Sequence, residues 1–342
     1  MKSMRKRILS ILCVVPLVLS LAGCGSKSGE ARIVRIAHNQ PTDHPINVAL
    51  LEFEQYIEER LGDKYNIEIY PNELLGSQPE MMQLTQTGAI DFCVASNSIL
   101  ESFSTKYGIF NLPYLFGSQQ AYYAAMADTS ITEPIFKSTR KAGFEGVTWM
   151  DAGSRSFYTV NKEINKPEDL KGLKIRVQQS PSNVEMMNRF GGSATPMNFG
   201  EVYTALQSGV IDGAENNELA LTANGHGDVC KYYSYDMHQM IPDVLVANCA
   251  FLDDLSEEDK AVFEEGYKIF NARECELFKQ AIEDAKKVAA EEKGVTFIYP
   301  DTAPFKEVCL PMHQNLLDAY PDLQPIYDAI QAYNAQYVSN GQ

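Results

Sequence analysis

The alternation of strand-like and helix-like segments is the feature that most constrains the fold of this chain. Residues 32–37, 65–70 and 90–95 are short segments with strand character, and residues 45–61 and 79–87 between them have the apolar spacing of helices. Strands that are joined through helices run parallel, and the helices then cover the faces of their sheet. This order predicts a parallel sheet that is covered by helices.

A second unit of the same kind begins near Gly146. Its predicted elements are strands near residues 148–152, 157–160 and 174–177 and helices from Ser182 and Phe199. The chain of 342 residues is long enough for two domains, so the fold class that the pattern indicates is α/β with two units.

One helix is predicted to be much longer than the others, from residue 256 to 293. Ser256 with Asp259 resembles a capping box at its start, and Gly294 is a typical end signal. Its apolar positions are spaced by three and four residues, with Glu274 as the exception among Phe263, Tyr267, Phe270, Leu277, Ala281, Ala285 and Val288. At ~1.5 Å per residue the helix is about 55 Å long, which exceeds one small domain. We expect it to span both domains; a surface helix with a break is the alternative.

The N-terminus has the features of a lipoprotein signal peptide. Four basic residues between positions 2 and 7 precede the apolar stretch 8–21, which ends in Leu-Ala-Gly-Cys at Cys24. We expect residues 1–23 to be removed, Cys24 to carry a lipid, and residues 24–30 to form a polar tether. The protein would then lie outside the cytoplasmic membrane, on its periplasmic side or on the outer surface. An uncleaved membrane anchor is the alternative.

The net charge of the chain excludes one class of partner and restricts how small anions can be bound. The formal net charge is −16, and loss of the four positive charges of the signal peptide makes it −20. Nucleic acid is excluded as a partner, because its phosphates require a basic surface. A small anion must be held by local positive charges against an unfavourable net field.

Cysteines and catalytic motifs give little support to other functions. Five cysteines remain after Cys13 and Cys24 are set aside, and their wide spacing favours buried free thiols over a disulfide framework. The sequence has no G-x-S-x-G, H-E-x-x-H or C-x-x-C motif and no glycine-rich phosphate loop. We expect no metal and no cofactor. A pair of catalytic carboxylates stays open, so an extracytoplasmic carbohydrate-active enzyme is the alternative of another class.

Arg176 is the residue that most directly indicates a binding function. It lies in a short apolar run with Leu173, Ile175 and Val177, and a buried unpaired charge there costs several kcal/mol. The acidic and amide cluster 212–217 follows downstream. The pattern predicts a pocket that holds a small carboxylate; a structural salt bridge is the alternative.

Several longer motifs resemble the solute-binding proteins of tripartite ATP-independent periplasmic (TRAP) transporters. They are LKGLKIRV (170–177), TPMNFGEVYTALQSGVIDGAEN (195–216), GSQPEMMQLTQTGAIDF (76–92), FNLPYLF (110–116) and the lipobox. The resemblance implies a monomeric, two-domain Venus flytrap fold with crossover strands and a long domain-spanning helix. We expect residues 31–152 plus 243–280 to form domain 1, and residues 153–242 plus 281–342 to form domain 2. The implied role is transport, not catalysis: capture of a solute and its delivery to the membrane permease.

The resemblance also implies roles for particular residues. Arg176 matches the arginine that pairs with the ligand carboxylate, and Arg155 matches a second basic position. Asn216 matches an asparagine that contacts the ligand, Phe199 an aromatic residue that packs on it, and Glu215 is placed to orient the arginines.

Weaker candidates follow the predicted strands or lie beside the stronger ones, where open α/β sheets bind ligands. They are His38, Asn39, Glu80, Ser96, Asn97, Gln178, Asn217 and His238. Glu80 has a second interpretation as a partner of its helix dipole, and His238 has one as a structural histidine.

The asparagine pair at Asn216 and Asn217 favours one class of ligand. Many relatives that bind sialate or dicarboxylates carry E-N-P where this chain has E-N-N. The sequence therefore resembles members that bind sugar acids, above all a hexuronate such as glucuronate or galacturonate. Sialate and C4-dicarboxylates are the alternatives.

Overall fold

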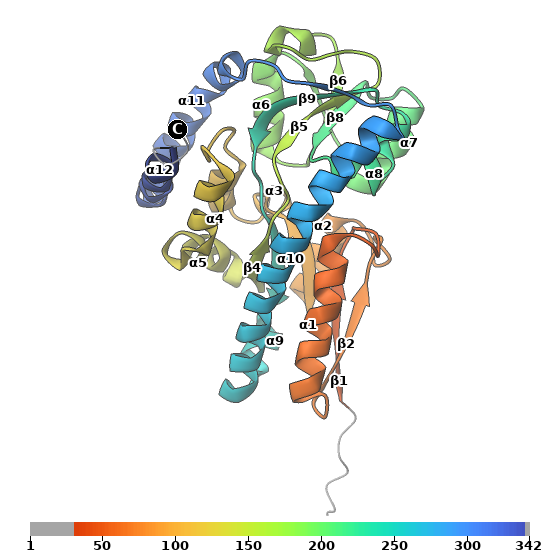
Figure 1. Cartoon of the computed structure of the whole chain (residues 1–342). Coiled ribbons are helices and arrows are strands. Elements are labelled where there is room, and N and C mark those ends of the chain that lie inside the picture. Colours follow the sequence, from red (N-terminus) through yellow and green to blue (C-terminus); the bar gives the residue numbers. More distant parts are fainter. Residues whose placement is uncertain (1–30, 339–342) are drawn as a thin grey trace, which may run out of the picture. The chain divides into compact units, whose positions relative to one another are not determined.

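The computed structural model describes residues 31–338, which contain two mixed β-sheets with helices packed around them (Figure 1). The predicted signal peptide (1–23), the lipid attachment at Cys24 and the tether (24–30) lie outside the described residues. Within residues 31–338, no helix combines the length and the apolar character that crossing a membrane requires.

The first sheet has the strand order β2-β1-β3-β10-β4. Its strands are β1 (Arg32–Ala37), β2 (Tyr65–Tyr70), β3 (Phe92–Ser96), β4 (Phe144–Met150) and β10 (Asp243–Asn248). β1 runs parallel to β2 and β3, as the β-α-β-α-β order predicts. The sheet as a whole is mixed, because β10, which is not among the predicted strands of this unit, runs antiparallel to both β3 and β4. β10 enters directly from the second sheet without a helical crossover, so nothing forces it to run parallel.

The second sheet has the order β11-β9-β5-β8-β6-β7. Its strands are β5 (Arg155–Thr159), β6 (Lys174–Val177), β7 (Ser193–Pro196), β8 (Gly213–Asn216), β9 (Tyr232–Gln239) and β11 (Thr296–Ile298). This sheet is also mixed, since β5 runs antiparallel to β8 and β9, whereas β6 runs parallel to β7 and β8. The chain passes from the first sheet to the second between β4 and β5, and returns between β9 and β10.

These two crossings lie at residues 151–154 and 240–242. The predicted domain boundaries after residues 152 and 242 fall in or at the end of these segments, and the division into domains stays a prediction.

The α-helices surround the sheets, and several begin and end where the sequence predicts. They are α1 (Pro45–Leu61), α2 (Gln78–Thr87), α3 (Asn97–Leu100), α4 (Gln119–Ala127), α5 (Thr129–Phe136), α6 (Pro181–Phe190), α7 (Val202–Gln207), α8 (Leu219–Thr222), α9 (Cys249–Asp254), α10 (Glu257–Glu291), α11 (Ala303–Ala319) and α12 (Gln324–Val338). The helix predicted from Phe199 starts as the 3₁₀ turn η4 (Phe199–Glu201) and continues as α7.

The long helix α10 packs against both sheets (Figure 1). Its N-terminus is capped by the Ser256 hydroxyl, which accepts a hydrogen bond from the Asp259 backbone N–H. Phe263, with Tyr267 and Phe270, packs in the core of the first sheet, and Ala289 packs in the core of the second. The prediction of a domain-spanning helix is confirmed.

The apolar face of α10 differs from the prediction in its second half. Phe278 and Ala289 are buried there, and Leu277 and Val288 are not fully covered. The buried positions step by four residues from Phe270 through Glu274 to Phe278, so the face drifts around the helix. Glu274, the exception in the sequence pattern, is fully buried.

The C-terminal helices divide between the two parts of the fold. α11 packs on α6, which follows β6 of the second sheet, whereas α12 packs on α4 and α5 beside the first sheet. One link is the Asn334 side chain, whose Nδ2 donates to the Leu115 carbonyl. The predicted boundaries assign all of residues 281–342 to domain 2, although the contacts of α12 are with α4 and α5.

The cysteines follow the prediction of free thiols. None of the five in residues 31–338 forms a disulfide, and all are buried except Cys275, which is partly exposed.

Candidate ligand cavity

A partly open cavity lies where strand ends of the two sheets meet. The lining residues are Asn39, Gln40, His44, Gln78, Pro79, Ser96, Ile99, Ala152, Arg155, Arg176, Gln178, Gln179, Met197, Asn198, Phe199, Asn216, Asn217, Leu219, Asn224, Asp243 and Phe278.

The strand directions explain why these residues converge. Asn39 follows β1, Ser96 ends β3 and Asn216 ends β8, so each lies at a carboxyl end. Asp243 begins β10 opposite Ser96, because β10 is antiparallel to β3. Arg155 begins β5, next to the end of the antiparallel strand β8. Where two neighbouring strands are antiparallel, the amino end of one lies beside the carboxyl end of the other. Residues at both kinds of strand end therefore lie at the same edge of the sheet.

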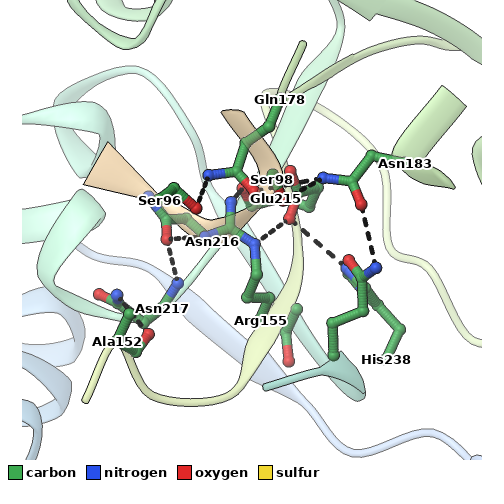
Figure 2. A network of polar contacts seen from close by, with 12 residues as sticks. Ser96, Ser98, Ala152, Arg155, Gln178, Asn183, Glu215, Asn216, Asn217 and His238 are labelled. Atoms are coloured by element: carbon green, nitrogen blue, oxygen red, sulfur yellow. Dashed lines mark hydrogen bonds and ion pairs between the residues drawn. The ribbon is translucent and has the colours of Figure 1, made fainter. Parts of the chain in front are cut away.

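Arg155 is buried, and each of its three guanidinium nitrogens donates a hydrogen bond to the protein. Its Nε donates to Glu215 Oε2 at 2.5 Å, Nη1 donates to Asn216 Oδ1 at 2.9 Å, and Nη2 donates to the Glu215 carbonyl at 2.9 Å (Figure 2). The guanidinium group of Arg155 thus combines an ion pair with two further hydrogen bonds, all to neighbouring residues of the strand β8. Arg155 therefore brings little uncompensated charge to the cavity.

A second cation, His238, lies near the same Glu215 oxygen that Arg155 contacts. His238 Nε2 lies 3.5 Å from Glu215 Oε2 (Figure 2), and His238 Nδ1 lies 2.7 Å from Asp236 Oδ2. Burial acts to lower the pKa of His238, but Asp236 and Glu215 raise it to about 9. Burial acts to raise the pKa of Glu215, and Arg155 with His238 lowers it to about 2. Both groups are charged at neutral pH.

Arg176 is equally buried, but no carboxylate within residues 31–338 forms an ion pair with it. Its side chain is 4% exposed, and Nε and Nη2 both donate to the Met197 carbonyl, at 3.2 and 3.0 Å. No ion pair joins Arg176 to any acid within residues 31–338. The Phe199 ring packs beside it, with 5.6 Å between the guanidinium carbon and the ring centroid. Burial lowers the pKa of Arg176, although the charge of Glu215 acts to raise it.

Amides complete the wall that the second sheet contributes. Asn216 Oδ1 accepts from Arg155 and from the Asn217 backbone N–H, which leaves the Asn216 amide N–H groups for a ligand. Both polar atoms of the Asn217 side chain are bonded: Nδ2 donates to the Ala152 carbonyl, and Oδ1 accepts from the Leu219 N–H. Gln178 Nε2 donates to Ser96 Oγ at 2.8 Å and so links the two walls (Figure 2).

The wall from the first sheet is polar but nearly uncharged. Asn39 Oδ1 is buried and has no hydrogen-bond partner within residues 31–338. His44 caps α1, its Nδ1 accepting from the Ile46 N–H, and burial lowers its pKa to about 3, so it is neutral. Asp243 is the one acid among the lining residues.

The structure brings together eight of the twelve predicted ligand-binding residues. Arg155, Arg176, Asn216 and Phe199 line the cavity, with the weaker candidates Asn39, Ser96, Gln178 and Asn217. Their roles toward a ligand stay predictions.

The other four predicted residues do not line this cavity. Glu80 is exposed and closes a capping box with Ser77. His38 bonds to Asn47, and Asn97 bonds to Asn111 and the Tyr107 carbonyl, so both are engaged inside the core. His238 lies beneath the cavity, behind Glu215.

Sequence reasoning missed Asp243 and Phe278 among the lining residues. Asp243 starts its strand, and the rule that ligands bind at carboxyl ends finds such a residue only once β10 is known to run antiparallel. Phe278 lies on the buried face of the second half of α10, which differs from the face that the sequence pattern predicts. Within residues 31–338, no three side chains of the metal-binding types gather into a group that could hold an ion.

Comparisons with known proteins agree on one family. The pattern of the family described as bacterial extracellular solute-binding protein, family 7 (DctP) matches residues 36–319. A TRAP periplasmic solute-binding protein from Anaerococcus prevotii, solved with bound α/β-D-glucuronate, is 61% identical with a TM-score of 0.88, and the match covers 89% of this chain and 99% of that chain.

Two further relatives are more distant in sequence. A TRAP periplasmic solute-binding protein from Xanthobacter autotrophicus, solved with bound β-D-galacturonate, is 32% identical with a TM-score of 0.84, over 87% of this chain and 99% of that one. The uncharacterized protein YiiZ of Salmonella typhimurium is 38% identical over 299 residues, which are 87% of this chain and 91% of that protein.

Proposed function

The chain belongs to the family-7 bacterial extracellular solute-binding proteins, and we propose that it is the hexuronate receptor of a TRAP-type membrane permease. Glucuronate and galacturonate are the hexuronates we favour, because structures similar to this chain hold one or the other. The family acts outside the cytoplasm and in transport rather than in catalysis.

The observation that carries this proposal is the contrast in pairing between Arg155 and Arg176. Glu215 neutralises Arg155 at 2.5 Å, whereas Arg176 is buried beside the cavity without a counterion within residues 31–338. A buried cation without a partner is costly, and a ligand carboxylate removes that cost. A guanidinium matches both oxygens of a carboxylate, so Arg176 is the group for the uronate C6 carboxylate.

The rest of the cavity suits a ligand with several hydroxyl groups. Asn216 offers amide donors, and Asn39 and Asp243 offer acceptors. A hydroxyl group donates one hydrogen bond and accepts others, so it can satisfy both kinds of side chain. A purely dicarboxylic ligand would leave the acceptors without donors.

The remaining parts of the proposal concern delivery. The receptor is a monomer that is anchored to the outer side of the cytoplasmic membrane by the lipid on Cys24. Its two domains close on the sugar acid, bending at the crossings between β4 and β5 and between β9 and β10, and the closed form docks on the permease.

Calorimetry with a matched set of ligands tests the proposed function. The protein from residue 31 onward, which forms one compact unit, is titrated with D-glucuronate, D-galacturonate, D-glucose and succinate. We expect saturable binding of at least one hexuronate and none of glucose, which lacks the carboxylate. The hexuronate should be recovered unchanged by chromatography. Tighter binding of succinate or glucose, or conversion of the sugar acid, would contradict the proposal.

A further inference from the structure

We infer that Asp243 is a specificity-determining residue of the cavity: its carboxylate accepts hydrogen bonds from ligand hydroxyl groups and rejects a second ligand carboxylate. This assignment rests on the proposed function, because it requires a hydroxylated acid in the cavity.

The position of Asp243 is fixed by two neighbouring strands. As the first residue of β10 it lies opposite Ser96 of β3 and Met150 of β4. It is 8% exposed and lines the cavity. The backbone on both sides is held in the sheet, so the carboxylate cannot move far from the cavity.

Asp243 differs from the other buried acids nearby because no donor within residues 31–338 bonds to its carboxylate. Glu215 accepts from Arg155, Asp236 from the Phe157 N–H, and Asp151 from the Gly153 N–H. No side-chain hydrogen bond or ion pair joins Asp243 to any other of residues 31–338. The carboxylate lines the cavity, so a hydroxyl donor of a bound ligand is the partner we expect for it.

The neighbouring arginines do not supply that donor. The Arg155 guanidinium donates to Glu215 and Asn216, and Arg176 donates from two of its nitrogens to the Met197 carbonyl. Arg176 lies on β6 of the second sheet, whereas Asp243 lies on β10 of the first. Among residues 31–338, the cavity therefore has a positive charge without a direct ion-pair partner on one wall and a negative charge without one on the other.

This arrangement fixes the orientation of an acidic ligand. Its carboxylate is attracted to Arg176 and repelled by Asp243, so the opposite end of the ligand must present hydroxyl groups to Asp243. An acid that carries a second carboxylate at that end would meet like charge in a buried site. Specificity for a sugar acid over a diacid then follows from one side chain.

The protonation of Asp243 makes the rejection of diacids depend on pH. Burial raises the pKa of Asp243 to about 6; Arg155 on β5 acts to lower it, and Asp151 after β4 acts to raise it. Glu274 on α10 is also near enough to interact electrostatically with Asp243. Above pH 6 the carboxylate is charged and repels a diacid, and below pH 6 it becomes neutral and the repulsion is lost.

A cycle of protein and ligand changes tests the assignment. Wild type, Asp243→Ala and Asp243→Asn are titrated with the preferred hexuronate and with its monodeoxy analogues. Asp284→Asn, an exposed acid on α10 that bonds to Gln280, controls for the loss of one negative charge. Thermal unfolding without ligand checks that each variant is folded.

We expect Asp243→Ala to weaken hexuronate binding about ten- to a hundredfold and Asp243→Asn to weaken it less. The loss of affinity that Asp243→Ala causes should be smaller for the deoxy analogue that lacks the hydroxyl group in contact with Asp243. The substitution and the deoxygenation remove the same interaction, so their effects should not add. An equal loss for every analogue would show a structural role and overturn the assignment, as would unchanged affinity in both variants. Absence of hexuronate binding by the wild type would overturn the proposed function and the assignment with it.

A diacid gives the second arm of the test. Wild type should bind D-glucarate more tightly at pH 5 than at pH 8, and Asp243→Asn should bind it equally at both pH values. Glucarate stays fully ionised over this range, so the change reports the protein. Rejection of glucarate by Asp243→Asn as strong as by wild type at pH 8 would contradict the repulsive role.

Discussion

The two walls of the cavity carry different chemistry although both are built from strand ends. The second-sheet wall holds two buried arginines, Arg155 and Arg176, with amides beside them. The first-sheet wall holds neutral polar groups and one acid, Asp243. We interpret the difference as a division of labour, in which one wall binds the charge of the ligand and the other reads its hydroxyl groups. A ligand must satisfy both walls to bridge the two sheets.

The largest expected effect comes from removing the unpaired cation. Arg176→Ala should reduce hexuronate affinity by more than a hundredfold, about 3–5 kcal/mol, because the ligand carboxylate then has no counterion. Calorimetry measures the affinity, and Arg60→Ala on the exposed face of α1 is the matched control. If Arg176→Ala retained its affinity, the ligand carboxylate would bind elsewhere, and the proposed difference in role between the two walls would be wrong.

The second arginine should matter more for stability than for affinity. Glu215→Gln leaves Arg155 buried without its counterion, so the free energy of unfolding should fall by about 3 kcal/mol. Urea unfolding measures this loss, with the exposed Glu59→Gln as control. Hexuronate affinity should change less than tenfold. A stable variant that no longer binds would instead make Arg155 and its pair part of the carboxylate site.

The buried histidine beneath the second-sheet wall should make stability depend on pH. The pKa of His238 is raised from 6.5 to about 9, so its charged form stabilises the fold fully below pH 6.5 and this contribution is lost as pH rises through 9. Between these values wild type should lose on the order of 2 kcal/mol more than His238→Gln. Thermal unfolding from pH 6 to 9.5 measures the difference. Parallel curves for the two proteins would show that His238 is neutral.

The smallest effect is expected where the walls touch directly. The hydrogen bond from Gln178 to Ser96 joins them at 2.8 Å, and its loss in Gln178→Ala should cost about 0.5–1.5 kcal/mol of binding free energy. Ser96→Ala should give a similar loss, and the double variant should lose little more, because both changes remove one interaction. Additive losses would show that the two side chains act separately.

Much of the fold could be predicted because local patterns agree with the tertiary structure. The bounds of β1, α1, β2 and β6 match the prediction, and the length and cap of α10 identify it as the helix that joins both sheets. The direction of β10 could not be predicted, because a buried apolar strand has the same pattern in parallel and antiparallel pairing.

The site was predictable where charge or resemblance marked it. Arg176 stands out because an arginine in an apolar strand needs an anion, and the structure places it at the cavity without an ion pair. Glu80, a weaker candidate at the start of a predicted helix, caps that helix and does not line the cavity. Asp243 gave no signal, because its role depends on which side chains from distant strands leave it without a donor.

The central claim is that the ligand carboxylate binds the second-sheet wall and the hydroxyl groups bind the first-sheet wall. A crystal structure of the protein with D-glucuronate bound tests it most directly. We expect both carboxylate oxygens at hydrogen-bond distance, about 2.7–3.0 Å, from the Arg176 guanidinium, and at least one ring hydroxyl at that distance from Asp243. A carboxylate that lies on the first-sheet wall, with hydroxyl groups on Arg176, would contradict the account.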